Sequence, residues 1–162
     1  MSERGQSEEK LTVLVAVDGS RFSQHALEWY IRVLYKPNFD LLLVHCMEPL
    51  SCISESTTPE EYEKMLADGK ETAKKVEDRF EQFLRENNVN GRTTTIFGHR
   101  PGEILIDTAK KENAAMIVVG SRGLSQVRKT LLGSVSDYLV HHAYCPVIVC
   151  RDPNIDNKLN IM

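Results

Sequence analysis

Apolar and polar residues follow one another along this chain in blocks that predict a regular succession of strands and helices. Five short runs consist mainly of apolar and β-branched residues, the pattern of strands buried on both faces of a parallel sheet. These runs are residues 11–17, 39–46, 92–97, 116–119 and 147–150. The third run is rich in threonine, so we expect that strand to lie in a more exposed position near an edge of the sheet.

Longer segments with an apolar residue every three or four positions separate these runs, as in helices that cover a sheet. They span about residues 22–35, 59–86, 102–111 and 134–143. Ser20 is the expected cap of the first, while Thr58 and Glu61 have the spacing of a capping box. The apolar stripe of the long second helix is expected to contact the core. The alternation predicts an α/β fold: a three-layer, Rossmann-like open parallel sheet of five strands with helices on both faces.

Composition narrows the class of protein. The chain has 162 residues, of which 41% are hydrophobic, and a net charge of −3. These values fit a single globular domain and argue against a nucleic-acid binder, which needs a broad basic face. No apolar run is long enough to span a membrane and the charged start lacks a signal-peptide core, so we expect a cytoplasmic protein without a membrane partner.

Cysteine and histidine spacing gives no sign of a metal site. The four cysteines form no C-x-x-C pair, so we expect reduced, apolar fillers. His141, His142 and Cys145 lie close together in the sequence, but neighbouring histidines on a helix point in different directions and a second nearby cysteine is missing. We therefore expect no metal site built from protein side chains.

The stretch that follows the fourth apolar run has the layout of an anion-binding loop. The run stops at Gly120, Gly123 follows, and Gly133 precedes a helical pattern. Glycines let backbone N–H groups approach an anion closely, and the first turn of a helix offers N–H donors with partial positive charge. Arg128 and Lys129 lie between these glycines. The alternative is that the glycines only turn the chain and that the basic side chains are solvated.

The spacing Gly120-x2-Gly123-x9-Gly133-Ser134 resembles the nucleotide motif of the ATP-binding branch of the universal stress protein family. The resemblance begins at the first strand, which ends in Val-Asp-Gly-Ser, and reaches the last, so it implies one nucleotide-binding domain over residues 11–151 between flexible tails at 1–10 and 152–162. It also implies the strand order 3-2-1-4-5. The first and fourth strands would then meet at the point where the order reverses, which is where such sheets bind ligands.

The resemblance assigns the sugar and base ends of an ATP site. From its place at a strand end, Asp18 is either a turn or capping residue or a ligand; in the family this Asp binds the ribose hydroxyls, a task that suits an acceptor-only carboxylate. The backbone of Val44 would contact adenine, and Ala16 and Val17 would line the base pocket.

The phosphate end would be formed by the glycine motif and the helix after it. Residues of the first turn would contact the ribose and the α-phosphate, and those at the helix start would hold the β- and γ-phosphates. The first group is Gly120, Arg122 and Gly123; the second is Gly133, Ser134, Val135 and Ser136. Mg²⁺ would accompany a triphosphate.

No nucleophile–base arrangement or carboxylate pair stands near the proposed phosphates, so the sequence favours an ATP-binding stress or signalling module with at most weak hydrolysis. An enzyme that cleaves the α–β bond and a nucleotide-free scaffold remain the alternatives. The last strand, Val147–Cys150, is apolar and lies at an edge in the expected order. Pairing with the same strand of a second copy would cover it and give the homodimer that the resemblance also implies.

Overall fold

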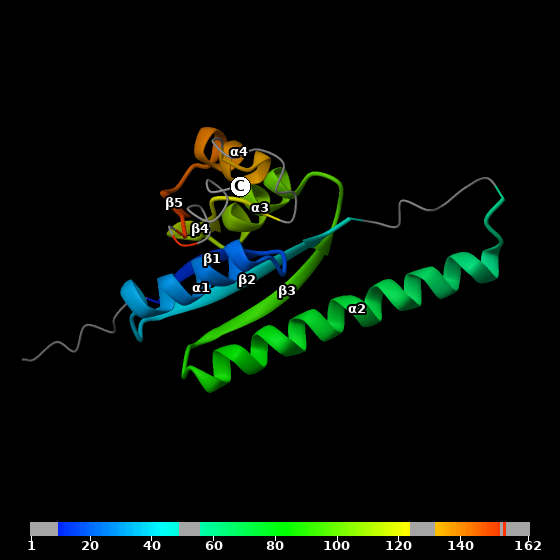
Figure 1. The fold of residues 1–162 in the computed structure, drawn as a ribbon, viewed down its shortest axis with the longest axis horizontal. Coiled ribbons are helices and arrows are strands. Elements are labelled where there is room, and N and C mark those ends of the chain that lie inside the picture. Colours follow the sequence, from blue (N-terminus) through cyan, green and yellow to red (C-terminus); the bar gives the residue numbers. More distant parts are fainter. Residues whose placement is uncertain (1–9, 49–55, 124–131, 153, 155–162) are drawn as a thin grey trace, which may run out of the picture.

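A computed structural model describes residues 10–48, 56–123, 132–152 and 154 of the chain. In these residues, five parallel strands form one sheet in the order β3-β2-β1-β4-β5 (Figure 1). The strands are β1 (Leu11–Val17), β2 (Phe39–Met47), β3 (Gly91–Phe97), β4 (Met116–Gly120) and β5 (Val147–Cys150). The helices are α1 (Arg21–Val33), α2 (Pro59–Glu86), α3 (Pro101–Lys111) and α4 (Ser134–His142). The predicted fold class and strand order are confirmed.

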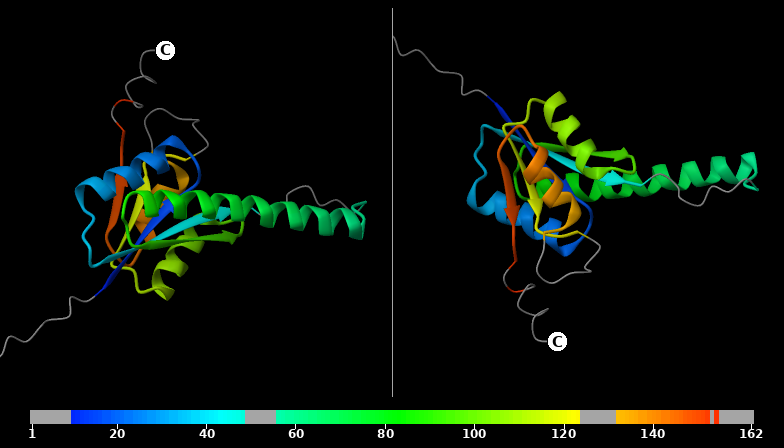
Figure 2. Two further views of the ribbon diagram at one scale, coloured as in Figure 1. Left: turned by 90° about the horizontal axis from the view of Figure 1, so that it is seen from below. Right: turned by 90° about the horizontal axis from the view of Figure 1, so that it is seen from above.

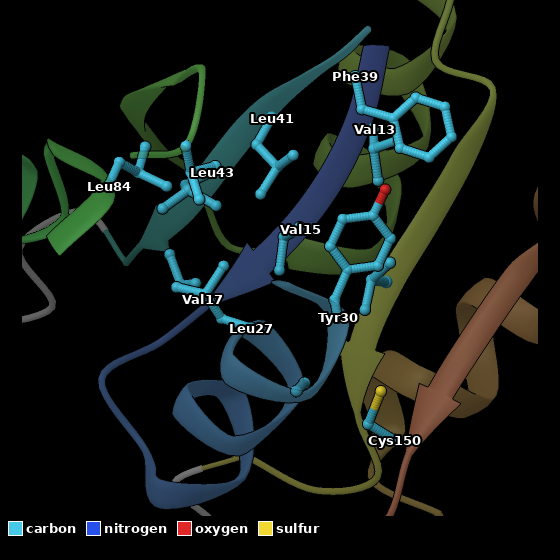
Figure 3. Packing of buried hydrophobic residues seen from close by; sticks show 13 residues of the cluster. Val13, Val15, Val17, Leu27, Tyr30, Phe39, Leu41, Leu43, Leu84 and Cys150 are labelled. Carbon is cyan, nitrogen blue, oxygen red and sulfur yellow. The ribbon is translucent and has the colours of Figure 1, made fainter. Parts of the chain in front are cut away.

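Two apolar layers hold the helices against the two faces of the sheet. Alternate residues of β1 point to opposite faces, so Val13 and Val15 join one layer and Leu14 joins the other. The first layer lies under α1 and α2 and surrounds Tyr30, as Figure 3 shows from close by. The second layer lies under α3 and α4, on the opposite side of the sheet (Figure 2). With both faces covered, the central strands β1 and β4 are almost entirely apolar, which explains their nearly unbroken runs in the sequence.

The predicted helix starts are present with their caps. The Ser20 hydroxyl accepts a hydrogen bond from the Ser23 N–H at 3.1 Å at the start of α1. At the start of α2, the Thr58 hydroxyl accepts from the Glu61 N–H at 3.2 Å, and the Glu61 carboxylate accepts from the Thr58 N–H at 2.9 Å. These local bonds satisfy amides that have no partner within the helix and therefore fix where each helix begins.

Helix α2 differs from the prediction in how far it is buried. Its 28 residues span roughly 42 Å at 1.5 Å per residue, whereas the neighbouring seven-residue strand β3 is only about half as long. The start of the helix therefore extends beyond the sheet (Figure 1), and Tyr62 and Leu66 remain 42% and 39% exposed. Only the later part of the apolar stripe, around Ala73 and Leu84, reaches the core.

The two edges of the sheet are formed by β3 and β5. The expectation that the threonine-rich strand lies at an edge is confirmed, and the Thr95 N–H of that strand donates to the Glu77 carboxylate of α2 at 2.6 Å.

Among the described residues, no helix combines the length and the apolar character needed to cross a membrane. Most of the two predicted tails, and Arg128 and Lys129, lie outside the described residues.

Candidate functional site

A cavity of about 280 Å³ lies at the carboxyl ends of β1, β2 and β4. Strands β1 and β4 are neighbours there, although β2 and β3 lie on the other side of β1, so this is the point where the strand order reverses. Every residue that the sequence assigns to the site lines this cavity. They are Ala16, Val17, Asp18, Val44, Gly120, Arg122, Gly123, Gly133, Ser134, Val135 and Ser136.

The turn after β1 fixes the orientation of the Asp18 carboxylate. Its Oδ1 atom accepts a hydrogen bond from the Ser20 N–H at 2.9 Å, and the backbone N–H of Asp18 donates to the Ser23 hydroxyl at 3.3 Å. Of the two roles considered for Asp18, that of a turn residue is therefore present in the fold. The other carboxylate oxygen, Oδ2, faces Gly123 across the cavity. The same side chain thus stabilises the turn and presents an acceptor oxygen to the glycine turn after β4.

The three glycines of the motif meet different neighbours. A Cβ atom at Gly123 would lie 2.6 Å from Asp18 Oδ2, and one at Gly133 would lie 3.2 Å from the Cα atom of Arg122. At Gly120, the added atom would lie 2.8 Å from the backbone C and O atoms of Phe22 in α1. The absence of a side chain at Gly120 therefore serves helix packing, while at the other two glycines it keeps the walls of the cavity close together.

The N-terminus of α4 forms the part of the cavity wall that lies against the glycine turn. Gly133 is the N-cap, with extended backbone, and its N–H donates to the Ser121 carbonyl at 2.8 Å. The Ser136 hydroxyl is buried and bonds to the carbonyls of Gly133 at 2.9 Å and Ser121 at 3.2 Å. The single proton of the Ser136 hydroxyl is used on these carbonyls, so the side chain holds the helix against the turn. The backbone amides in the first turn of α4 are then the groups suited to bind an anion.

The other end of the cavity is apolar. Ala16, Val44 and Val119 are buried there on one face of the sheet, and the Cys46 side chain adjoins them. Burial raises the pKa of the Cys46 thiol to about 11, so it is uncharged at neutral pH. An apolar slot of this kind suits a nucleobase, with polar groups confined to its rim.

Sequence reasoning missed five residues of the cavity wall: Ser23, Cys46, Glu48, Pro101 and Val119. Two of these had a detectable signal, because strand alternation puts Cys46 on the same face as Val44, and Val119 immediately precedes the motif. Glu48 and Pro101 come from segments outside any motif, and only the folded chain brings them to the cavity. Within the described part of the chain, no group of three or more His, Cys, Asp or Glu side chains is arranged to hold a metal ion.

Comparison with known proteins gives the same picture. Universal stress protein YxiE of Bacillus subtilis is 30% identical over 145 residues, which cover 86% of this chain and 97% of that protein. Among solved structures, universal stress protein UspA from Lactobacillus plantarum matches with a TM-score of 0.72 and 26% identity, covering 88% of this chain and 99% of its own. A universal stress protein family protein from Arabidopsis thaliana, solved with AMP bound, matches with a TM-score of 0.65 and 25% identity, covering 90% and 94%.

The family description "Universal stress protein family" matches residues 11–151, which is most of the sequence. The sheet order, the cavity at its reversal point and the glycine motif are all carried by this stretch. The chain belongs to the universal stress protein family.

Proposed function

We propose that this protein binds ATP in the cavity at the ends of β1 and β4 and acts as a nucleotide-dependent stress-response or signalling module. The observation that carries the proposal is that one cavity brings together an apolar slot, the Asp18 carboxylate and the N-terminus of α4. A base, a sugar and a chain of phosphates need these three kinds of surface. The solved family member with AMP bound supports the class of ligand.

Each part of the nucleotide has a matching group. Adenine would lie in the slot beside Ala16 and Val119 and meet the backbone of Val44. The ribose hydroxyls would donate to Asp18, while the phosphates would meet the amides of the first turn of α4, where the helix dipole favours negative charge. Mg²⁺ would be held mainly by phosphate oxygens and water, because it keeps several waters in such sites and the described residues offer no cage for it.

Two of the ionisable groups that line the described cavity, Asp18 and Cys46, favour binding over turnover, and Glu48 is the remaining carboxylate in its wall. The Asp18 carboxylate is held by the Ser20 N–H, and the Cys46 thiol is protonated at neutral pH because burial raises its pKa to about 11. Neither is placed as a general base for an attacking water. We therefore propose at most weak ATP hydrolysis; rapid conversion of ATP to AMP by the pure protein would favour the alternative of a hydrolase.

The proposal includes a homodimer formed through β5. This strand is an edge of the sheet, and its apolar residues Val147, Ile148 and Val149 are only partly buried in the single chain. Antiparallel pairing of two such edges would satisfy both rows of backbone groups and cover the apolar side chains. Light scattering at micromolar concentration tests this point, and a monomeric mass would contradict it.

The experiment that tests nucleotide binding is mass spectrometry of small molecules released from freshly purified protein, with added Mg²⁺-ATP as a second arm. Gly133→Val places branched carbons beside Arg122 and should reduce ATP retention, while its extended backbone remains allowed for valine. Gly69→Val is the matched control: the nearest atom to a Cβ at Gly69 is 4.0 Å away on Phe97, and Gly69 does not line the cavity. Equal retention by both variants would overturn the phosphate assignment.

A further inference from the structure

His45 lies one residue beyond Val44 in β2 and faces the opposite side of the sheet. In the strand register it stands between Val17 of β1 and Thr95 of β3, at the same end of the sheet as the cavity. Only 9% of its surface is exposed. A histidine so deeply buried next to a binding site is unusual, because its charged form is costly to bury without partners.

Contacts connect this ring to α2. The His45 Nδ1 atom is 3.5 Å from the Thr95 hydroxyl, and the backbone N–H of Thr95 donates to the Glu77 carboxylate of α2 at 2.6 Å. Since β1, β2 and β3 are consecutive in the sheet, the four groups Asp18, His45, Thr95 and Glu77 form a row across its carboxyl edge. The row begins at the proposed ribose ligand and ends on a helix that contributes nothing to the described cavity wall.

Two carboxylates act on the ring from neighbouring elements. Burial lowers the pKa of His45 below its ordinary value of 6.5, while the charges of Asp18 on the turn after β1 and Glu77 on α2 oppose that effect. Burial is the larger influence, so the ring is neutral at pH 7 and above. When it is protonated, it becomes a cation next to the carboxylate that is proposed to hold the ribose.

We propose that His45 is a positioning residue of this site, whose protonation adds a positive charge beside the Asp18 carboxylate that is proposed to accept the ribose hydroxyls and so makes nucleotide affinity depend on pH. The inference rests on the proposed function. A bound nucleotide removes water from Asp18 and adds phosphate charge at the same end of the sheet. Both changes strengthen the attraction between the ring and its surroundings, since charges interact more strongly where water is excluded. Nucleotide and proton therefore bind cooperatively, and by linkage the affinity for the nucleotide rises as the pH falls.

The test measures Mg²⁺-ATP affinity by calorimetry between pH 8 and pH 5.5 for the wild type and for His45→Gln, which keeps a hydrogen-bonding side chain without a titratable charge. The terminal phosphate of ATP titrates in the same range, so the informative quantity is the ratio of the two affinities at each pH. That ratio should rise roughly three- to tenfold on acidification, which corresponds to a pKa change of up to about one unit on binding. His141→Gln, on the exposed side of α4, is the matched control and should follow the wild type.

A second measurement does not depend on nucleotide affinity. The ring signals of His45, followed by NMR in the nucleotide-free protein, should report a lower pKa in Asp18→Asn and in Glu77→Gln than in the wild type. Both substitutions keep an acceptor oxygen and remove the charge. Nucleotide binding with a constant affinity ratio, or a His45 pKa that both substitutions leave unchanged, would overturn this inference while the proposed function stands. Wild-type protein that binds no adenine nucleotide at any pH would overturn both.

Discussion

The Oδ2 atom of Asp18 lies 2.6 Å from the position that a Cβ atom would occupy at Gly123. This is closer than real Cβ atoms approach an oxygen, so the carboxylate and the glycine turn fit together only because residue 123 has no side chain. The two residues are far apart in the sequence, and each follows one of the two strands that flank the point where the order reverses. The glycine therefore determines where the carboxylate can lie.

Gly123→Ala should weaken nucleotide binding without unfolding the protein. The added methyl group forces the Asp18 side chain to rotate away from its position, which removes an acceptor of hydrogen bonds from the proposed ribose site. Loss of a charge-assisted hydrogen bond corresponds to roughly a tenfold or larger loss of affinity. Titration with Mg²⁺-ATP measures the change, and Gly69→Ala, which has room for its methyl group, should bind like the wild type. Unchanged affinity in Gly123→Ala would show that Asp18 does not act from this position.

Gly120→Ala should act on stability, in contrast to Gly123→Ala. Here the added carbon would lie 2.8 Å from the backbone C and O atoms of Phe22, and a backbone moves less easily than the end of a side chain. Helix α1 would have to shift away from β4, and overpacking of this kind costs about 2 kcal/mol. Urea denaturation of the nucleotide-free protein measures it. A free energy of unfolding within about 0.5 kcal/mol of the wild type would mean that α1 adjusts without cost.

The three glycines of the motif, Gly120, Gly123 and Gly133, also show what the sequence can and cannot predict. The motif predicts that they lie near an anion site because the stretch ends a strand and precedes a helix start. It does not distinguish their roles, because the deciding neighbours, Phe22 of α1 and Asp18 of the turn after β1, come from a distant part of the sequence. The strand order depended on the family resemblance in the same way, since alternation alone predicts a parallel sheet without ordering its strands.

Helix α2 and Ser136 show two further limits. A period of three to four residues identifies the apolar face of α2, but the length of the strand beside it decides how much of that face is covered. Tyr62 lies beyond the covered part.

The hydroxyl of Ser136 has the right chemistry for a phosphate, yet in the fold its proton is directed to the Gly133 and Ser121 carbonyls. Side-chain chemistry therefore names candidates, and local hydrogen bonding decides which atoms are available.

Tyr30→Phe should stabilise the protein. The Tyr30 ring is fully buried among Val13, Val15 and their neighbours (Figure 3), and within the described part of the chain its hydroxyl has no hydrogen-bond partner. A buried polar group without a partner is costly, so its removal should raise the free energy of unfolding by about 1 kcal/mol.

Tyr35→Phe provides the matched comparison for that prediction. The Tyr35 hydroxyl accepts a hydrogen bond from the Asn90 N–H at 2.9 Å, so its removal leaves a donor without this partner and should lower stability by about 1 kcal/mol. Urea denaturation of both variants measures the two changes. If both variants lose stability to the same extent, the Tyr30 hydroxyl has a partner in solution and the prediction is wrong.

The stability of the nucleotide-free protein should fall as the pH drops below about 7, and His45 should be one cause. Burial lowers the pKa of His45 in the folded state from its ordinary value of 6.5, so between these two pKa values the unfolded chain binds more protons than the folded one. The contribution of His45 to the free energy of unfolding then increases with pH across this window and is constant above it. Urea denaturation at pH 8, 7, 6 and 5.5 measures the slope, which should be smaller in His45→Gln than in the wild type. His141→Gln, which alters an exposed ring, should keep the wild-type slope. Identical slopes in the wild type and His45→Gln would show that the ring is solvated or already charged in the folded protein, and that its burial imposes no cost on protonation.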